Sequence, residues 1–194
     1  MEKVISIVGA GGKTTLVHKL AREYHRRGKG VLVTTTTHMY VEADTDLSCD
    51  FFALRDKIIK DGYCMAGQKI SEQSKPKMCG LPYDLLAKLI KDMPQALDYV
   101  IIEADGAKHH SLKYPAADEP VIYPLTTDVI IVLGTWEKGK LCKDVVFRYE
   151  LMQNELGMAE DVVVDDSVID TLRQVYVKKL RDSGFEGRIS TYYR

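Results

Sequence analysis

The chain has 194 residues, a hydrophobic fraction of 45% and a formal net charge of −1. This length suits one sizeable domain with a full core, and the near-neutral charge disfavours nucleic acid or a membrane surface as a partner. The apolar run near the N-terminus is too short for a signal peptide or a membrane span. The four scattered cysteines include no C-x-x-C pair, which argues against a zinc ribbon or a disulfide framework and favours a reduced, cytoplasmic setting.

The first 35 residues alternate strand and helix. Residues 4–8 form a run rich in β-branched side chains, which predicts a strand, and a cluster of glycines follows it directly. From Thr14 the apolar residues recur at helical spacing, and Gly28 is suited to end that helix. Residues 30–35 predict the next strand. Such a βαβ unit implies parallel strands and a right-handed connection.

The middle of the chain is less regular. We interpret residues 40–80 as a segment inserted beside the main sheet, with a helix at 51–60 and one or two short strands or a hairpin. Residues 81–91 show the spacing of an amphipathic helix, with a proline suited to its first turn. The region from 108 to 124 is rich in proline and charge, which predicts a long ordered loop.

Two nearly continuous apolar runs, at 99–102 and 129–133, are typical of strands covered by helices on both faces. The remaining elements that we expect are helices at 144–156 and 168–183 and short strands at 162–164 and 189–193. The sequence therefore predicts a single α/β domain over residues 1–194. Its mostly parallel sheet would be covered by helices on both faces, as in P-loop NTPases.

The glycine cluster matches a phosphate-binding loop. A triphosphate needs inward-pointing backbone N–H groups, which glycines allow, and a cation on its outer phosphates, which Lys13 would supply. The hydroxyl of Thr14 would bind magnesium, and the N-terminus of the following helix adds positive potential. We expect ATP or GTP with Mg²⁺ as the ligand. The residues of this loop are Gly9, Ala10, Gly11, Gly12, Lys13, Thr14 and Thr15.

The loop departs from the full G-x-x-x-x-G-K-[ST] pattern, because that pattern requires glycine where Ile7 stands. The observed G-x-x-G-K-T form resembles the shortened loop of Mur ligases. A glycine-rich turn with an incidental lysine is the alternative, which the strand before the loop and the helix after it disfavour.

Threonines and a histidine follow the second strand. Strand ends line the ligand crevice of a parallel sheet, so Thr36, Thr37 and His38 are candidates for holding a magnesium-bound water or contacting the γ-phosphate. Thr34 and Thr35 are better explained by the preference of threonine for strands. For the other three residues the two explanations are balanced.

Acidic residues end the strand at 99–102. A carboxylate there is costly unless a cation or hydrogen bonds satisfy it, and magnesium in the crevice would do so. Glu103 with Gly106 resembles the E-x-x-G form of Walker B in some metallochaperone GTPases, while Asp105 is the alternative magnesium ligand. A polar strand end at the surface is the less favoured alternative.

Basic residues follow in the loop. Lys108, His109, His110 and Lys113 would meet phosphate or an anionic substrate, and Glu119 would fix the loop. The more ordinary interpretation is that these charges are solvated, just as Arg148 is more often a helix salt bridge than a phosphate contact. The chain has no N-K-x-D guanine-reading motif, which weakly favours ATP over GTP.

Four blocks of sequence resemble one family in their order and spacing: I-V-G-A-G-G-K-T-T, V-T-T-T-T-H, I-I-E-A-D-G-A-K and L-K-Y-P-A-A-D-E-P-V-I-Y-P. The chain is similar to the selenium-dependent hydroxylase accessory proteins, the YqeC-like family, over roughly residues 3–157. This resemblance implies a P-loop protein whose partner is a selenium-dependent molybdenum hydroxylase or its cofactor.

Three functions stay open at this point. The first is a magnesium-dependent NTPase, in which Lys13 neutralises the γ-phosphate, Thr14 with Glu103 or Asp105 holds the metal, and Thr37 or His38 positions water. The second is a kinase or Mur-like ATP-dependent ligase, with residues of the basic loop, among them Lys108, binding a small anionic substrate. The third is a nucleotide-gated binding module without catalysis.

Overall fold

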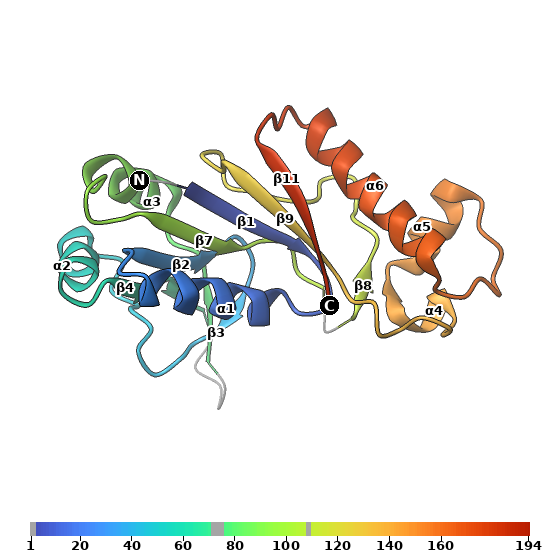
Figure 1. Ribbon diagram of the computed structural model, residues 1–194, viewed down its shortest axis with the longest axis horizontal. Helices are drawn as coiled ribbons and strands as arrows, with labels where there is room; N and C mark the ends of the chain where they lie inside the picture. Colours follow the sequence, from blue (N-terminus) through green and yellow to red (C-terminus); the bar gives the residue numbers. More distant parts are fainter. Residues whose placement is uncertain (1–2, 71–75, 108–109) are drawn as a thin grey trace. The chain divides into compact units, whose positions relative to one another are not determined.

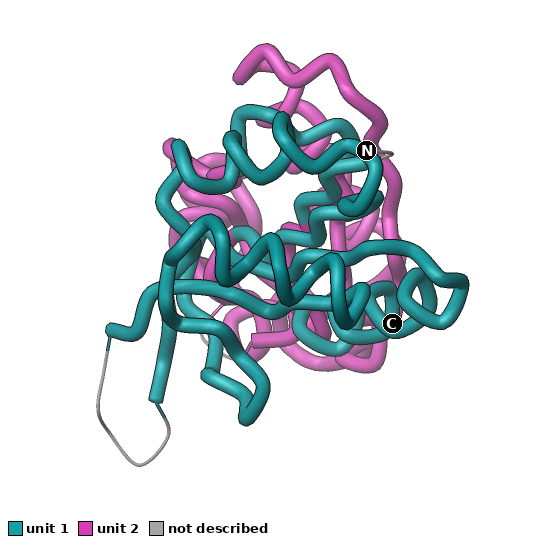
Figure 2. The backbone as a smooth tube through the Cα atoms, turned by 90° about the vertical axis from the view of Figure 1, so that its left-hand side faces the viewer, with its two compact units in different colours: residues 1–6, 14–104, 122–128 teal, residues 7–13, 105–121, 129–194 magenta. Residues whose placement is uncertain are grey.

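The computed structural model describes residues 3–70, 76–107 and 110–194, and these form two compact units (Figures 1 and 2). Unit 1 holds the described residues of 1–6, 14–104 and 122–128, and unit 2 holds those of 7–13, 105–121 and 129–194. The division passes through the first strand, β1 (Lys3–Gly9). That the chain is a single domain stays a prediction.

A six-stranded sheet is the main element of the fold, and its hydrogen-bonded order is β11-β9-β1-β7-β2-β4. Strand β2, next to the edge strand β4, pairs in parallel with both β4 and β7. The α/β class and the mostly parallel, helix-flanked sheet expected from the sequence are confirmed.

Unit 1 contains most of the first half of the chain. Its helices and strands are α1 (Lys13–Arg26), β2 (Val31–Thr35), β3 (Met39–Tyr40), α2 (Phe51–Asp61), β4 (Tyr63–Met65), β5 (Gln68–Lys69), β6 (Lys77–Cys79), α3 (Tyr83–Asp92) and β7 (Tyr99–Glu103). The small sheet β3-β6-β5 is antiparallel.

Alternation along the strands sets the two faces of the sheet in unit 1. Leu32 and Ile102 lie in one buried cluster with Leu54 of α2 and Leu89 of α3. Because successive side chains of a strand point to opposite faces, Tyr99 points to the other face, where its ring stacks on Tyr24 of α1 at 3.8 Å between centroids. Helices therefore cover both faces of this part of the sheet.

Unit 2 contains β8 (Leu112–Lys113), most of β9 (Asp128–Leu133), α4 (Cys142–Val145), β10 (Val146–Phe147), α5 (Tyr149–Leu156), α6 (Asp166–Asp182) and β11 (Arg188–Tyr193). The long helix α6 begins after Asp165, whose carboxylate accepts a hydrogen bond from the backbone N–H of Val168. Its buried face carries Leu172, Tyr176 and Leu180 at helical spacing.

Three expected elements differ from the structure. The helix predicted at 144–156 is broken, because Val146 and Phe147 pair with β8 as a short parallel strand and Arg148 adopts a left-handed backbone with φ of 65°. The strand predicted at 162–164 is only an isolated bridge from Val163 to Leu141. Within the segment 40–80, β4 joins the main sheet instead of lying beside it.

Candidate functional site

The glycine loop follows β1 and belongs to unit 2 as far as Lys13. Gly9 has a φ of 90°, and a Cβ there would lie 2.2 Å from the carbonyl oxygen of Val132 in β9. The next backbone N–H, of Ala10, donates to that same oxygen at 2.9 Å. The start of the loop is thus fixed against β9 by its backbone, and no side chain fits at Gly9.

Lys13 is the first residue of α1 and is only 6% exposed. Its ammonium group donates to the carbonyl oxygen of Gly9 at 2.7 Å, so the side chain turns back along the loop. The ammonium group that the sequence predicted as a phosphate-binding cation thus lies against the backbone of the glycine loop.

Thr14 follows Lys13 directly and belongs to unit 1, where its hydroxyl donates to Oε2 of Glu103 at 2.6 Å. Thr14 is exposed, whereas Glu103, the last residue of β7, is 8% exposed. A hydroxyl and a carboxylate are the oxygen ligands that Mg²⁺ prefers. Two residues that lie 89 positions apart in sequence, and that were both predicted as magnesium ligands, are therefore in direct contact.

Threonines at and directly after the end of β2 hold the backbone of Glu103 in place. The hydroxyl of Thr35 donates to the carbonyl oxygen of Glu103 at 2.6 Å, and the N–H of Thr36 donates to it at 3.0 Å. The N–H of Thr37 in turn donates to the hydroxyl of Thr35 at 2.9 Å. Thr35 thus does more than favour a strand, because it links β2 to the end of β7. His38 is exposed, and Thr37 is half-buried.

Asp105 lies in unit 2 in different surroundings. Its carboxylate is fully buried and forms an ion pair with Lys113, whose side chain is also 0% exposed. The hydroxyl of Tyr176 donates to Oδ2 of Asp105 at 3.0 Å, and Lys113 also donates to the carbonyl oxygen of Gly106 at 2.6 Å. Burial raises the pKa of Asp105 although Lys113 opposes that change.

Glu119 and Arg148 complete this group, which we call the Asp105 cluster: Asp105, Lys113, Glu119, Arg148 and Tyr176. Lys113 forms a second ion pair with Oε2 of Glu119 at 2.8 Å, and Arg148 binds both oxygens of that carboxylate. Burial would raise the pKa of Glu119, but hydrogen bonds from Arg148, Lys113 and the N–H of Ala116 lower it to about 2. Two carboxylates and two cations thus neutralise each other inside unit 2.

Sequence reasoning described this cluster incompletely. The expectation that Lys113 is solvated is wrong, since a charge in a loop next to prolines carries no sign of burial in its sequence. Glu119 does fix the loop, because Oε2 accepts from the N–H of Ala116 at 3.1 Å. Tyr176 was missed, and its place in the apolar period of α6 was the available signal. Lys108 and His109 lie outside the described residues.

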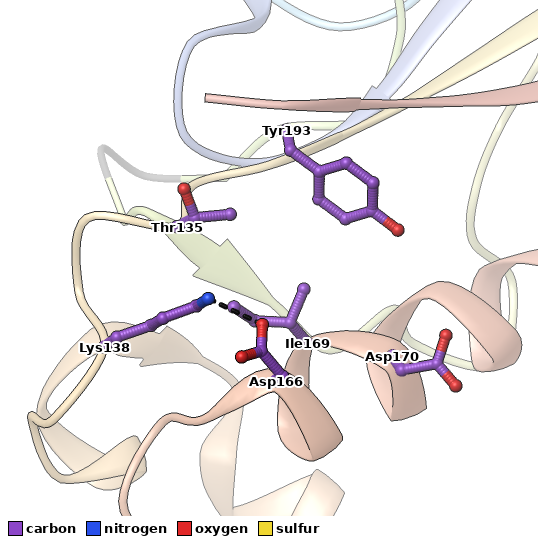
Figure 3. A pocket seen from close by; sticks show the side chains of 6 residues that line it. All are labelled: Thr135, Lys138, Asp166, Ile169, Asp170 and Tyr193. Carbon is purple, nitrogen blue, oxygen red and sulfur yellow. Dashed lines mark hydrogen bonds and ion pairs between the residues drawn. The ribbon is translucent and has the colours of Figure 1, made fainter.

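A hollow of about 350 Å³ lies elsewhere in unit 2 (Figure 3). Asp166 and Asp170 of α6 line it, and Lys138 forms an ion pair with Asp166 at 2.6 Å. Two acids against one base make this hollow unsuited to phosphate. Within the described ranges no group of three or more His, Cys, Asp or Glu residues would hold a metal, and no helix is long and apolar enough to cross a membrane.

Comparison with known proteins places these features in a family. The model of the YqeC protein family matches residues 5–150, which include the glycine loop and Glu103. The chain belongs to the YqeC family. It is 31% identical over 170 residues to the protein YqeC of Escherichia coli (strain K12), a match that covers 83% of this chain and 63% of that relative. The chain thus spans less than two thirds of the relative, and the family match ends before α6 and β11.

Proposed function

We propose that the chain binds a nucleoside triphosphate with Mg²⁺ through the loop from Gly9 to Thr15 and hydrolyses it. The observation that carries this proposal is the 2.6 Å contact between the hydroxyl of Thr14 and the carboxylate of Glu103, directly after the glycine loop. A strand, a glycine loop, a lysine and a threonine at a helix start are the context in which a triphosphate is held. The carboxylate adds the second protein ligand for magnesium.

Each residue has a role in this proposal. The backbone N–H groups of the loop bind phosphate oxygens, and Lys13 leaves the carbonyl of Gly9 to neutralise charge on the outer phosphates. Thr14 and Glu103 hold the metal, while Thr37 or His38 positions the attacking water. Positioning and electrostatic stabilisation are most of what phosphoryl transfer needs. Asp105 acts only through its cluster, because Lys113 and Tyr176 occupy its carboxylate.

Thermal unfolding tests the nucleotide site. The parent chain is heated with Mg-ATP and with Mg-GTP, beside Lys13→Ala and the control Lys19→Ala, which removes an exposed lysine of the same helix. At a hundredfold excess over Kd a ligand adds about 2.7 kcal/mol, which raises the Tm of a chain this size by roughly 5–10 °C. The rise should persist in Lys19→Ala and vanish in Lys13→Ala. No rise with either nucleotide would overturn the proposal.

The cellular role that we propose is maturation of a selenium-dependent molybdenum hydroxylase or loading of its cofactor. The sequence resemblance supports it, and membership of the YqeC family agrees with that resemblance. A nucleotide cycle would drive such assembly if the two nucleotide states bound the partner differently. Purified hydroxylase should therefore bind the chain with different affinities in Mg-ATP and Mg-ADP. Equal affinities would remove the role in maturation and leave nucleotide binding untouched.

A further inference from the structure

We propose that Arg194 is a second phosphate-binding cation, which Trp136 holds beside the glycine loop until the nucleotide arrives. This inference rests on the proposed function and names a residue that the sequence did not single out. All the contacts that carry it lie within unit 2.

The side chain of Arg194 lies directly over the loop. A Cβ built on Gly12 would stand 2.8 Å from both Cδ and Nη1 of Arg194. Gly12 also has a φ of 118°, a backbone that side-chain-bearing residues rarely adopt. The missing side chain at Gly12 therefore lets a guanidinium group approach the residue that precedes Lys13.

An aromatic ring holds this guanidinium. Cζ of Arg194 lies 5.3 Å from the centroid of Trp136. The indole is itself fixed, since its N–H donates to Oε1 of Glu137 at 2.8 Å, and the hydroxyl of Ser111 donates to the same oxygen at 2.8 Å. These hydrogen bonds orient the indole of Trp136 against which the guanidinium of Arg194 lies.

The backbone of Arg194 is anchored, so that only its side chain needs to move. Its N–H donates to the carbonyl oxygen of Leu133 at 3.1 Å. Its own carbonyl oxygen accepts from the N–H and from the hydroxyl of Thr135, each at 2.7 Å. Because its backbone is already held, binding a ligand would restrict only the exposed side chain of Arg194.

The chemistry of this cation suits phosphate. The planar guanidinium fork matches two phosphate oxygens, which gives stronger and better-oriented hydrogen bonds than a neutral donor. Within the described part of the chain Arg194 forms no ion pair with a carboxylate, and an exposed cation–π contact is weak. A triphosphate on the loop therefore offers Arg194 a better partner than the indole does.

The experiment measures binding by calorimetry with two probes, Mg-ATP and magnesium tripolyphosphate, which carries the phosphates without a nucleoside. Arg194→Ala should bind both probes about 10- to 100-fold more weakly, the effect of losing a charged hydrogen-bond partner. Arg194→Lys, which keeps the charge but loses the fork, should fall between the parent and Arg194→Ala. The control Arg55→Ala removes an arginine that lies over Phe52 at 5.1 Å, on α2, and should bind like the parent.

Fluorescence adds a direct readout, because Trp136 is the single tryptophan of the chain. Tripolyphosphate should change its emission in the parent as the guanidinium leaves the ring, and should change it far less in Arg194→Ala. Equal affinities of the parent and Arg194→Ala for both probes would overturn the role of Arg194. If Lys13→Ala still lost binding in that case, the nucleotide site would stand without Arg194. A parent that bound neither probe nor GTP would overturn both proposals.

Discussion

Glu103 and Asp105 stand two residues apart in one sequence motif, yet their surroundings differ completely. Glu103 accepts a hydrogen bond from the exposed Thr14, and Thr35 at the end of β2 and Thr36 after it hold its backbone. Asp105 is sealed between Lys113 and Tyr176, on a left-handed backbone with φ of 69°. The carboxylate of Glu103 is bonded to a neutral hydroxyl, whereas the carboxylate of Asp105 is already paired with a cation.

Both residues are buried, at 8% and 4% exposed, so the difference lies in the partners of each carboxylate. A fully buried carboxylate must be paired or hydrogen-bonded, and the Asp105 cluster supplies both. Lys113 forms ion pairs with both Asp105 and Glu119, so binding a hydrated metal ion there would require these buried pairs to break. We therefore propose Thr14 and Glu103, rather than Asp105, as the magnesium ligands. Substitutions in the two groups should have different effects on folding and on binding.

The largest effect is expected for Lys113→Met. Removing this buried ammonium group leaves Asp105 and Glu119 close together without the cation that they share, and breaking a buried pair in this way costs about 3–5 kcal/mol. Urea unfolding measures the loss. The control Lys178→Met removes a surface pair with Asp182 and should cost about 0–1 kcal/mol.

Adding Asp105→Asn to Lys113→Met should recover part of that stability, since one uncompensated charge is then removed. A loss in Lys113→Met no larger than in Lys178→Met would show that the cluster does not stabilise unit 2.

The second expected effect is on the pH dependence of stability. Glu119 has its pKa lowered from 4.5 to about 2 in the folded state, so its contribution is complete above pH 4.5 and is lost as the pH falls toward 2. The loss is at most on the order of 3 kcal/mol. Asp105 acts in the opposite direction, because burial raises its pKa. Its contribution to stability is present at low pH and is lost as the pH rises above the ordinary pKa of an aspartate.

The comparison is therefore made between the parent and Glu119→Gln, in which Asp105 is still present. Urea unfolding between pH 5 and pH 2 should show a steeper fall in the parent. Parallel curves for the two chains would contradict the assignment of Glu119 to the cluster.

The smallest effect on folding is expected for Glu103→Gln, which should change the free energy of unfolding by no more than about 1 kcal/mol. Its effect should appear in binding instead, as an affinity for Mg-ATP about 10- to 100-fold weaker, because the amide is a poorer magnesium ligand than the carboxylate. Calorimetry in magnesium and in EDTA separates the binding of ATP through the metal from the binding of ATP without it. A Glu103→Gln chain that bound equally well in magnesium, or unfolded as easily as Lys113→Met, would reverse the comparison.

Local pattern gave the main strands and most helices of this fold. The apolar run before the glycines and the helical spacing after Thr14 placed β1 and α1, and residues 51–60 and 81–91 closely matched α2 and α3. The break at Arg148 was not predictable, because it depends on the pairing of Val146 and Phe147 with β8, some 34 residues earlier. The same holds for β4, a three-residue strand whose place is fixed by its partner β2.

Some features depend on neighbours along the chain and could be predicted from local pattern: the α/β class, the glycine loop and the lysine and threonine that follow it. Which charges are buried depends on the tertiary fold, because desolvation is caused by groups that lie far away in sequence. The fold places Thr14 beside Glu103, pairs the buried Asp105 with Lys113 and Tyr176, and places Arg194 over Gly12. Those contacts join residues up to 182 positions apart, and no local pattern records them.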